Sequence, residues 1–484
     1  MFDILNRRSF LKRTAGLSAI SMAPTTILPL QHDPVFGRDR YLLIDDRIIE
    51  RVENASLQPG KVKKHPANPL FSEDKPWEVR IDNVYANVIF DQEEQLYKCW
   101  YSPFIVDLSA KGMTDAQRST AYDPPSNREM GICYATSKDG LSWEKPELGL
   151  VEFDGSKANN IVWRGSQPTG QNWYDPHGTG IFKDLADPDP KRRYKAFLKG
   201  DILSVSFSAD GIHWSPALPC PEADVPGDTH NNAFWAPTLG HYVGITRRWG
   251  DTYGRQVART TSHDFVTWSK SEVVLEGLSK AHQTYAMPVF FYAGVYLGLL
   301  ALYDSVNDRT WTEITWSADT IHWHRVAPGT PLIANAPNDR DYDFGCVYAA
   351  ATPVFLNNEI RLYYGASDGY HFGWRNGFIC LATLRPDGFA GYASASNKTA
   401  SLTTHQISVR AGTLYLNADV SEGGSVNITV IDEKGDVLAM SETVKESAVQ
   451  QMIRWKQGAM LNEGQVVQLK LEWQNAKVYS FGFA

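Results

Sequence analysis

The chain has 484 residues, a net charge of −8 at neutral pH and a hydrophobic fraction of 43%. This length predicts two or three domains, and the hydrophobic fraction is ordinary for a chain that buries a core. The acidic balance argues against a nucleic-acid partner, because binding to phosphates needs basic patches.

The first thirty residues carry a targeting pattern. The stretch Asn6–Lys12 reads NRRSFLK and resembles a bacterial twin-arginine export signal. The apolar stretch Ala15–Leu28 is interrupted by Pro24 and is too short to span a bilayer. We therefore expect a signal peptide over residues 1–30 that is removed, a periplasmic or secreted protein, and no membrane anchor after that removal.

Five hairpins recur along the middle of the chain, each made of an apolar strand, a short polar turn and a second apolar strand. They cover Asn87–Ser102, Gly178–Gly200, Asn231–Arg248, Tyr285–Tyr303 and Cys346–Ser367. A repeat built only from strands and turns is typical of a β-propeller, so we predict five blades over residues 36–392. We expect the early strand Tyr41–Ile49 to complete the last blade, because a closed ring needs a strand from the opposite terminus.

Four of the hairpin units are followed by a tag that contains serine, aspartate and tryptophan. The tags are Ser137–Trp143, Ser208–Trp214, Ser262–Trp268 and Ser317–Trp323. Serine and aspartate side chains close turns by bonding to nearby amides, glycine supplies a positive φ, and tryptophan packs between sheets. We interpret the tag as an element of the fold and not of catalysis.

Beyond about residue 393 the pattern changes to short alternating strands with polar connectors such as Glu422–Gly424. This pattern predicts a β-sandwich over residues 398–484. The predicted fold class is therefore all-β, with a five-bladed β-propeller followed by a C-terminal β-sandwich.

The sequence gives little indication of a cofactor. The five cysteines lack metal-ligand spacing, and no HExxH motif is present. We expect no cofactor, with a calcium or zinc ion on the propeller axis, held by aspartate and histidine, as the alternative.

In a propeller each innermost strand begins near the axis, so the residues at the starts of these strands line the mouth of the channel. Those positions hold Asp82, Asp175, His177, Asp228, His230, Asn231, His282, Tyr285 and Asp343. Every unit supplies an acid, an imidazole or both. Such groups converging on one cavity are what polar recognition and acid–base chemistry require. Two carboxylates of different pKa are the minimum apparatus for hydrolysing a glycosidic bond.

Further candidates lie outside these strand starts. Arg247 and Arg248 end the third hairpin and are candidates for binding a uronate or sulfate, or for pairing with surface acids. His371, in the sequence DGYHFGW, is placed to reach the same site from the fifth unit.

The five units, the opening His65–Leu70 (HPANPL) and the repeated tags resemble the propeller glycoside hydrolases of families 32, 43, 68 and 117 over residues 36–392. The resemblance implies a base or nucleophile at Asp82 and a residue that orients it or tunes its pKa at Asp175. Those families carry a glutamate as the acid in the third blade, where this chain has Asp228 instead. The Asn-Asp-Pro-Asn and Glu-Cys motifs of invertases are absent.

Three functions are compatible with these residues. The first is a secreted glycoside hydrolase acting on a plant or algal polysaccharide or its oligosaccharides, with Asp82 as base, Asp175 as modulator and Asp228 as acid. The second is a polysaccharide lyase that cleaves uronate-containing glycans by β-elimination with histidine, tyrosine and arginine. The third is a propeller that binds glycans without cleaving them. All three imply a carbohydrate partner.

Overall fold

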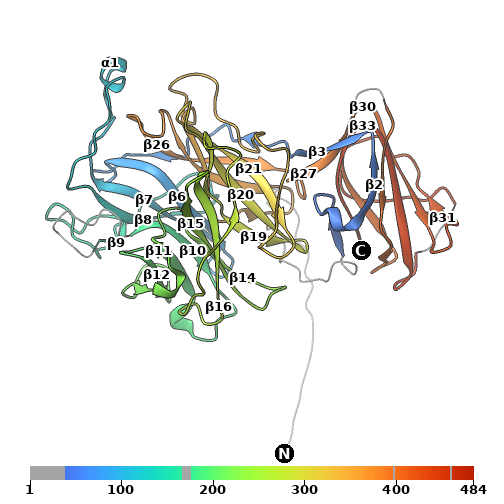
Figure 1. The fold of residues 1–484 in the computed structure, drawn as a ribbon, viewed down its shortest axis with the longest axis horizontal. Helices are drawn as coiled ribbons and strands as arrows, with labels where there is room; N and C mark the ends of the chain where they lie inside the picture. Colours follow the sequence, from blue (N-terminus) through green and yellow to red (C-terminus); the bar gives the residue numbers. More distant parts are fainter. Residues whose placement is uncertain (1–38, 166–175, 396–397, 458–460) are drawn as a thin grey trace, which may run out of the picture.

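The computed structural model describes residues 39–165, 176–395, 398–457 and 461–484, except for the side chain of Asp82. It contains two bodies that lie side by side in Figure 1, with a ring of small sheets on the left and a second β-domain on the right. The first body is the predicted five-bladed propeller.

Each blade is an antiparallel sheet whose strands follow one another in sequence. Blade one contains β6 (Arg80–Asp91), β7 (Leu96–Val106), β8 (Glu129–Ser137) and β9 (Ile161–Arg164). Blade two contains β10 (His177–Lys183), β11 (Tyr194–Lys199), β12 (Leu203–Ser208) and β13 (Leu218–Pro219). Blade three contains β14 (Asn232–Ala236), β15 (His241–Gly250), β16 (Gly254–Ser262) and β17 (Glu272–Leu275). Blade four contains β18 (His282–Ala286), β19 (Val289–Tyr292), β20 (Val295–Asp304), β21 (Arg309–Ser317) and β22 (Trp323–Arg325). Blade five contains β23 (Cys346–Ala349), β24 (Val354–Phe355), β25 (Ile360–Ser367) and β26 (Gly377–Leu384).

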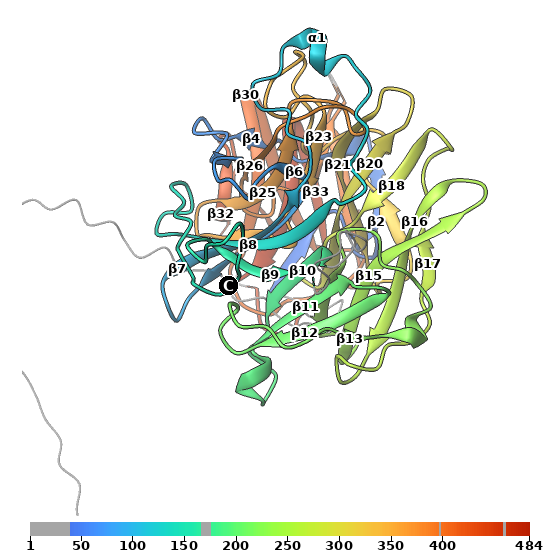
Figure 2. The same cartoon turned by 90° about the vertical axis from the view of Figure 1, so that its left-hand side faces the viewer.

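Strands β6, β10, β14 and β19 of blades one to four contact one another in turn, β20 and β21 of blade four contact β23 of blade five, and β23 contacts β6 of blade one, so the ring is closed. Figure 2 views the propeller from the left-hand side of Figure 1 and shows the blades arranged around a centre. The central strands of the blades are buried over almost their whole length, as in β20 and β11. The near-continuous apolar run of β20 therefore follows from packing on both faces.

The four tags form the turns that their residue types predict. In the first tag the Ser137 hydroxyl donates to Asp139 Oδ1 at 2.9 Å, and this oxygen accepts two backbone N–H groups at 2.8 Å. The fourth position has a positive φ in every tag, whether it is glycine or, as at Phe265 and Thr320, a larger residue. The tags also bond to the preceding blade, as where Trp100 Nε1 donates to the Gly211 carbonyl at 2.7 Å. Their structural role is confirmed.

The expectation that Tyr41–Ile49 completes the last blade is wrong. The ring is closed instead by β4 (Lys63–Lys64) and β5 (Phe71–Ser72), which pair with β26 of blade five. Between them the amide of Asn68 donates to the Leu381 carbonyl and accepts from the Leu381 N–H, both at 2.8 Å. A side-chain amide thus replaces a strand residue at this point, and the HPANPL motif performs the closure.

The second domain combines both ends of the described chain. Its ten strands are β1 (Arg40–Leu42), β2 (Ile49–Glu53), β3 (Ala55–Pro59), β27 (Ala390–Ser394), β28 (Ala400–Thr404), β29 (Ile407–Ser408), β30 (Leu414–Ile431), β31 (Val437–Met440), β32 (Ala448–Met452) and β33 (Val466–Phe483). The long strands β30 and β33 pair along most of their length, and β1 also pairs with β33. Residues 40–59, which the sequence suggested for the propeller, therefore belong to this domain.

The domains meet around Asp387, which stands where a fifth tag would be. This carboxylate is 1% exposed and accepts hydrogen bonds from Tyr292 of blade four, Arg40 of β1, and Asn417 and Ser480 of the second domain. Charged hydrogen bonds are the strong ones, so a buried carboxylate with four donors fixes the junction.

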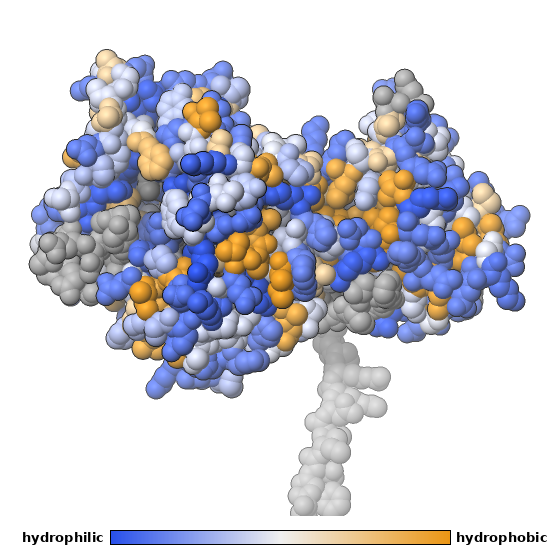
Figure 3. All heavy atoms as spheres, viewed as in Figure 1, coloured by the Kyte–Doolittle hydropathy of each residue, from blue (hydrophilic) through white to orange (hydrophobic). Residues whose placement is uncertain are grey.

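Helices are few in the described residues. One α-helix, α1 (Asp115–Arg118), and three short 3₁₀ turns (Asp46–Ile48, Pro190–Arg192 and Pro221–Ala223) are present there. Helix α1 lies in a long loop between β7 and β8 that projects from the propeller (Figures 1 and 2). The loop reaches blade five, where Arg118 pairs with Asp368. Apolar side chains are spread among hydrophilic ones over both bodies on the face drawn in Figure 3.

Candidate active site

All five blades contribute to one group of polar and aromatic side chains near the axis, called here the axial cluster. Its members are Asn83, Tyr85, His177, Asp228, His230, Arg247, Arg255, Tyr285, Tyr348, His371 and Arg375. Six of them were predicted as site residues from the sequence, namely His177, Asp228, His230, Arg247, Tyr285 and His371. Convergence at the axis is therefore observed for these six.

The backbone explains how Asp228 and His177 meet. Gly178, with a φ of 55°, lets β10 approach the loop before β14 so closely that a Cβ there would lie 1.6 Å from the Thr229 carbonyl oxygen. The side-chain amide of Asn231 donates to the carbonyls of Gly178 and Gly227 at 3.1 and 2.7 Å. Asn231 is fully buried, so it positions this loop and does not present itself to a substrate.

Asp228 is the solvent-accessible carboxylate of the described cluster, with 36% of its side chain exposed. Its Oδ1 lies 3.1 Å from His177 Nε2, and its Oδ2 lies 3.4 Å from Arg247 Nη1. Burial opposes ionisation, but the hydrogen bond from His177 and the charges of Arg247 and His177 outweigh it and hold the pKa of Asp228 well below its usual range. Asp228 is therefore a carboxylate at any working pH.

His230 is the second imidazole beside these groups. It is 1% exposed, and its ring lies 5.1 Å from that of Tyr85. Burial, helped by nearby His177, lowers its pKa to about 3. Its Nε2 lies 3.4 Å from Asn87 Oδ1, an oxygen that accepts from the Ile181 N–H, so Nε2 carries the hydrogen. His230 is a neutral side chain in the folded protein.

Tyr285 lies between two guanidinium groups. The Cζ atoms of Arg247 and Arg255 stand 4.4 and 5.1 Å from its ring centroid. Arg247 also donates through Nη2 to the Tyr285 carbonyl at 2.7 Å. Two cations over one ring give this part of the cluster a positive character, which Asp228 compensates only in part.

Blade five adds a hydrogen-bonded network that the sequence did not predict, apart from His371. The Tyr348 hydroxyl lies 3.1 Å from His371 Nδ1, and Arg375 donates to Asn83 Oδ1 at 3.2 Å. Asn83 in turn donates to the hydroxyl of Tyr285 at 3.1 Å. Arg375 follows His371 in the loop between β25 and β26. Because His371 was expected to reach the axis from this loop, Arg375 could have been predicted there as well.

The start of β6 has an unusual backbone. Val84 and Tyr85 have φ values of 64° and 44°, and the pairing of β6 with β7 shifts register on both sides of Val84. A positive φ is costly for a β-branched residue and tends to be kept at functional sites. The distortion places Asn83 and Tyr85 on the same side, where Asn83 donates to the Tyr85 hydroxyl at 2.8 Å.

Three predicted site residues point elsewhere. Arg248 bonds Ser271 and Asp224 on the outer side of blade three. His282 is 40% exposed beside Asp304 and Trp311 of its own blade. Asp343 is buried and pairs with Lys64 of β4 and with the Tyr364 hydroxyl, so it belongs to the closure of the ring.

The two other predicted carboxylates are not tested. Asp175 lies outside the described residues, and the side chain of Asp82 does too, although its backbone belongs to β6. Their roles as modulator and base therefore stay predictions.

A cleft of about 810 Å³ opens beside the axial cluster. It is lined by the loop after α1, by the β20–β21 turn and by the blade-five loop, including Tyr122, Asp308, Tyr370 and Phe372. Asp308 accepts a hydrogen bond from Tyr303 at 2.9 Å, and the Phe372 and His371 rings lie 4.5 Å apart. The cleft and the axial cluster thus share walls. Tyr370 and Phe372 are 47% and 61% exposed, so their rings are accessible.

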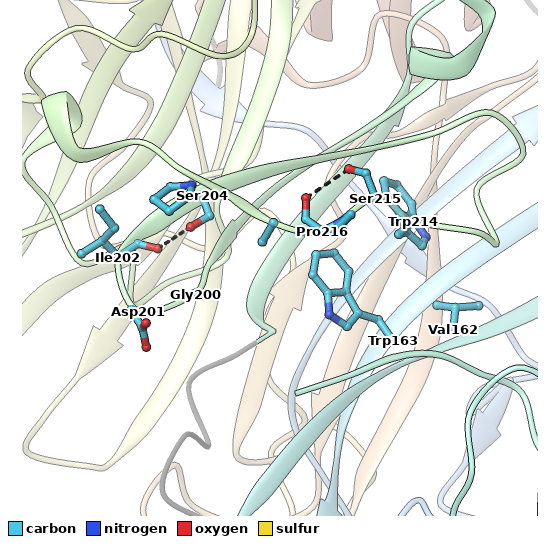
Figure 4. A pocket seen from close by; sticks show the side chains of 11 residues that line it. Val162, Trp163, Gly200, Asp201, Ile202, Ser204, Trp214, Ser215 and Pro216 are labelled. Carbon is cyan, nitrogen blue, oxygen red and sulfur yellow. Dashed lines mark hydrogen bonds between the residues drawn. The ribbon is translucent and has the colours of Figure 1, made fainter. Parts of the chain in front are cut away.

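A second hollow of about 500 Å³ lies between blades one and two (Figure 4). The rings of Trp163 and Trp214 stack there with centroids 6.4 Å apart. The hydroxyls of Ser204 and Ser215 bond to the nearby carbonyls of Ile202 and Pro216. The lining holds one carboxylate, that of Asp201, and no histidine, so it lacks the paired groups found at the axis.

Within the described ranges no three histidine, cysteine, aspartate or glutamate side chains gather to hold a metal ion. All five cysteines are buried and free. No helix in this part of the chain has the length and apolar character needed to cross a membrane.

No protein-family model and no curated protein matches the chain. Solved structures that are similar include a glycosyl hydrolase from Bacteroides ovatus, with 14% identity over 68% of this chain and 94% of that one and a TM-score of 0.47. A family 43 arabinoxylan arabinofuranohydrolase from Bacillus subtilis is 12% identical over 87% of this chain and 98% of its own, with a TM-score of 0.37. An α-L-arabinofuranosidase from Podospora anserina is 11% identical over 67% and 97%, with a TM-score of 0.40. The five-bladed fold itself is shown by the strand pairing of this chain.

Proposed function

We propose that this protein is a glycoside hydrolase whose active site is the axial cluster. The observation that carries the proposal is Asp228, an ionised and partly exposed carboxylate bonded to His177 and Arg247 at the point where the five blades meet. A charged group held in place by fixed partners, among aromatic walls, suits both substrate positioning and proton transfer.

The sequence assigned Asp228 as the acid, and its lowered pKa is the opposite of what a general acid needs. In the proposed mechanism Asp228 instead remains ionised and stabilises the positive charge that develops on the sugar ring. His177 holds this carboxylate in place, because its Nε2 bonds Asp228 and its Nδ1 lies 2.9 Å from Met130 Sδ. Asp82 remains the proposed base or nucleophile and Asp175 the proposed modulator.

Exposed aromatic rings beside the cluster supply the proposed contacts to sugar. Trp249, at the end of β15, is 58% exposed, and Phe372 in the cleft is 61% exposed. Flat apolar ring faces pack well on the C–H faces of pyranose rings. The Phe372 ring lies 6.1 Å from that of Tyr303, and Arg255 stands over both Tyr303 and Trp249, so the two exposed rings are linked through one group of side chains and could contact the same glycan.

A lyase is the second candidate, and one observation favours it. Tyr285 stands between Arg247 and Arg255, with His371 at 4.9 Å, which is the set of groups that β-elimination at a uronate requires. An arginine would neutralise the carboxylate while histidine or tyrosine moves the proton. A product with a new double bond, absorbing in the ultraviolet, distinguishes this reaction from hydrolysis.

The substrate and location belong to the same proposal. We propose a plant or algal polysaccharide or its oligosaccharides, and export through the twin-arginine pattern of residues 7–12, which precede the described part of the chain.

The test is a glycan panel screened with Asp228→Asn and with Asp224→Asn as its matched control. Asp224 lies four residues earlier and is exposed on the surface, where it pairs with Arg248 and Lys270. We expect Asp228→Asn to lose about 10²- to 10³-fold in kcat, the range for losing one group that stabilises transition-state charge, while glycan binding persists and Asp224→Asn keeps full activity. Equal turnover by both variants would refute the assignment. Binding by the native protein without any product would indicate a non-catalytic propeller.

A further inference from the structure

Arg255 is held in a fixed orientation at the edge of the axial cluster. It lies on β16 directly across from Trp249 of β15, and its Cζ stands 4.8 Å from the Trp249 ring centroid. The rings of Tyr285 and Tyr303 each lie 5.1 Å away. Its backbone carbonyl accepts from the Thr284 hydroxyl at 2.8 Å, which fixes the strand at this residue. Three rings and one anchor leave the guanidinium little freedom.

The charge of Arg255 is not balanced by a carboxylate of the described residues. Among the described residues no carboxylate lies within 4.0 Å of its guanidinium nitrogens, and the side chain it bonds to is the neutral amide of Gln283, at 2.9 Å. Its Nε is buried and makes no hydrogen bond in the same set of residues. The neighbouring arginines differ, because Arg247 pairs with Asp228 and Arg248 pairs with Asp224.

The electrostatic surroundings agree with this geometry. Burial lowers the pKa of Arg255, the nearby charge of Arg247 lowers it further, and the tyrosines oppose the change. Taking a guanidinium partly out of water is unfavourable unless an anion or further acceptors replace the water. An arginine kept half-buried with donors unused is therefore prepared for a partner that arrives from outside.

We propose that Arg255 is the receptor for an anionic group on the glycan, a carboxylate or a sulfate ester. This inference rests on the proposed function and specifies its substrate as an acidic glycan. The planar fork of a guanidinium matches carboxylate and sulfate oxygens, and rings on three sides limit the direction from which the anion approaches. Exposed Trp249, stacked beside Arg255, then contacts the apolar face of the same sugar.

The experiment measures dissociation constants by calorimetry for matched glycan pairs. The probes are oligoglucuronates with their carboxyl-reduced neutral counterparts, and sulfated galactan oligosaccharides with their desulfated counterparts. The variants are Arg255→Gln, Arg255→Lys and the control Arg259→Gln. Arg259 lies on the same strand, is partly buried and also has a lowered pKa, but it bonds to Thr320 in the fourth tag.

We expect the native protein to bind the charged member of one pair about 10- to 100-fold more tightly, the range for hydrogen bonds between charged groups. Arg255→Gln should remove this preference, Arg255→Lys should keep part of it, and Arg259→Gln should keep all of it. The uronate pair and the sulfate pair show which anion is recognised. Arg255→Lys keeps the test valid if the glutamine variant fails to fold.

Two results would overturn the inference. One is a native protein that binds or cleaves both members of every pair equally, which leaves the proposed glycosidase intact and removes its acidic substrate. The other is an unchanged preference in folded Arg255→Gln. Failure to bind or cleave any glycan would instead remove the proposed function together with this inference.

Discussion

Replacing His230 with glutamine should change how stability depends on pH. The imidazole titrates at about 3 in the folded protein and at 6.5 when unfolded, so below pH 6.5 the unfolded chain binds a proton that the folded chain does not. Stability is therefore lost as pH falls from 6.5 toward 3. At pH 5 the loss from this one residue is about 2 kcal/mol, from 1.36 kcal/mol per pKa unit. Glutamine keeps the hydrogen-bond donor to Asn87 and has no such titration.

The assay is urea unfolding followed by tryptophan fluorescence at pH 7.5 and pH 5. We expect the native protein to lose about 2 kcal/mol more than His230→Gln between these two pH values, whatever constant offset the substitution brings. His405→Gln is the control, because His405 is exposed on the second domain. Parallel pH dependence in the native protein and His230→Gln would show that His230 is not a buried neutral imidazole, and the reasoning on the axial cluster would have to be revised.

Two further predictions concern the frame around the site. Burial raises the pKa of Glu73 to about 8 although the N–H groups of Ile81 and Gly377 donate to it, so the folded state holds the extra proton and stability falls as pH rises from 4.5 to 8. Glu73→Gln should therefore be about 3 kcal/mol more stable than the native protein at pH 7 and no more stable at pH 4, as measured by urea unfolding; a constant difference would contradict this. Gly211→Ala should lower the stability by about 2–4 kcal/mol, because φ is +81° and the new Cβ would lie 2.6 Å from the Trp100 ring. Gly240→Ala, with φ +70° and open space, should lose about 1 kcal/mol in the same unfolding assay, and equal losses would exclude the proposed clash.

The repeat was predictable because its signals are local. A tag such as Ser208–Trp214 specifies its own turn through side-chain bonds that span only a few residues. Ring closure was not predictable by the same means. The short strands β4 and β5 offer almost no periodicity, and part of their role is taken by the side chain of Asn68. The longer apolar strand at Tyr41 was the stronger local signal, and it pairs instead with β33 near the other end of the chain.

The members of the site were predictable where the position of a residue along its blade is enough to bring it to the axis. The strand-start rule brought His177 and Asp228 to the axis, since both stand where an innermost strand begins. The rule gives no side-chain orientation. Neighbouring residues of a strand face opposite sides, so Arg247 reaches Tyr285 while Arg248 reaches Asp224. The orientation of Arg255 is set by three rings on other strands, and no short stretch of sequence contains that arrangement.

The pairing of Arg40 with Gly482 has a consequence for the order in which the protein forms. Strand β33 leaves the ribosome after all five blades, so β1 has no β33 to pair with while the blades emerge. The propeller's closing strands β4 and β5 need only β26, which leaves the ribosome earlier. Contacts between distant parts of a chain form slowly because the intervening loop must be closed first. The propeller is thus expected to assemble during synthesis, and the second domain to complete itself only after β33 has left the ribosome.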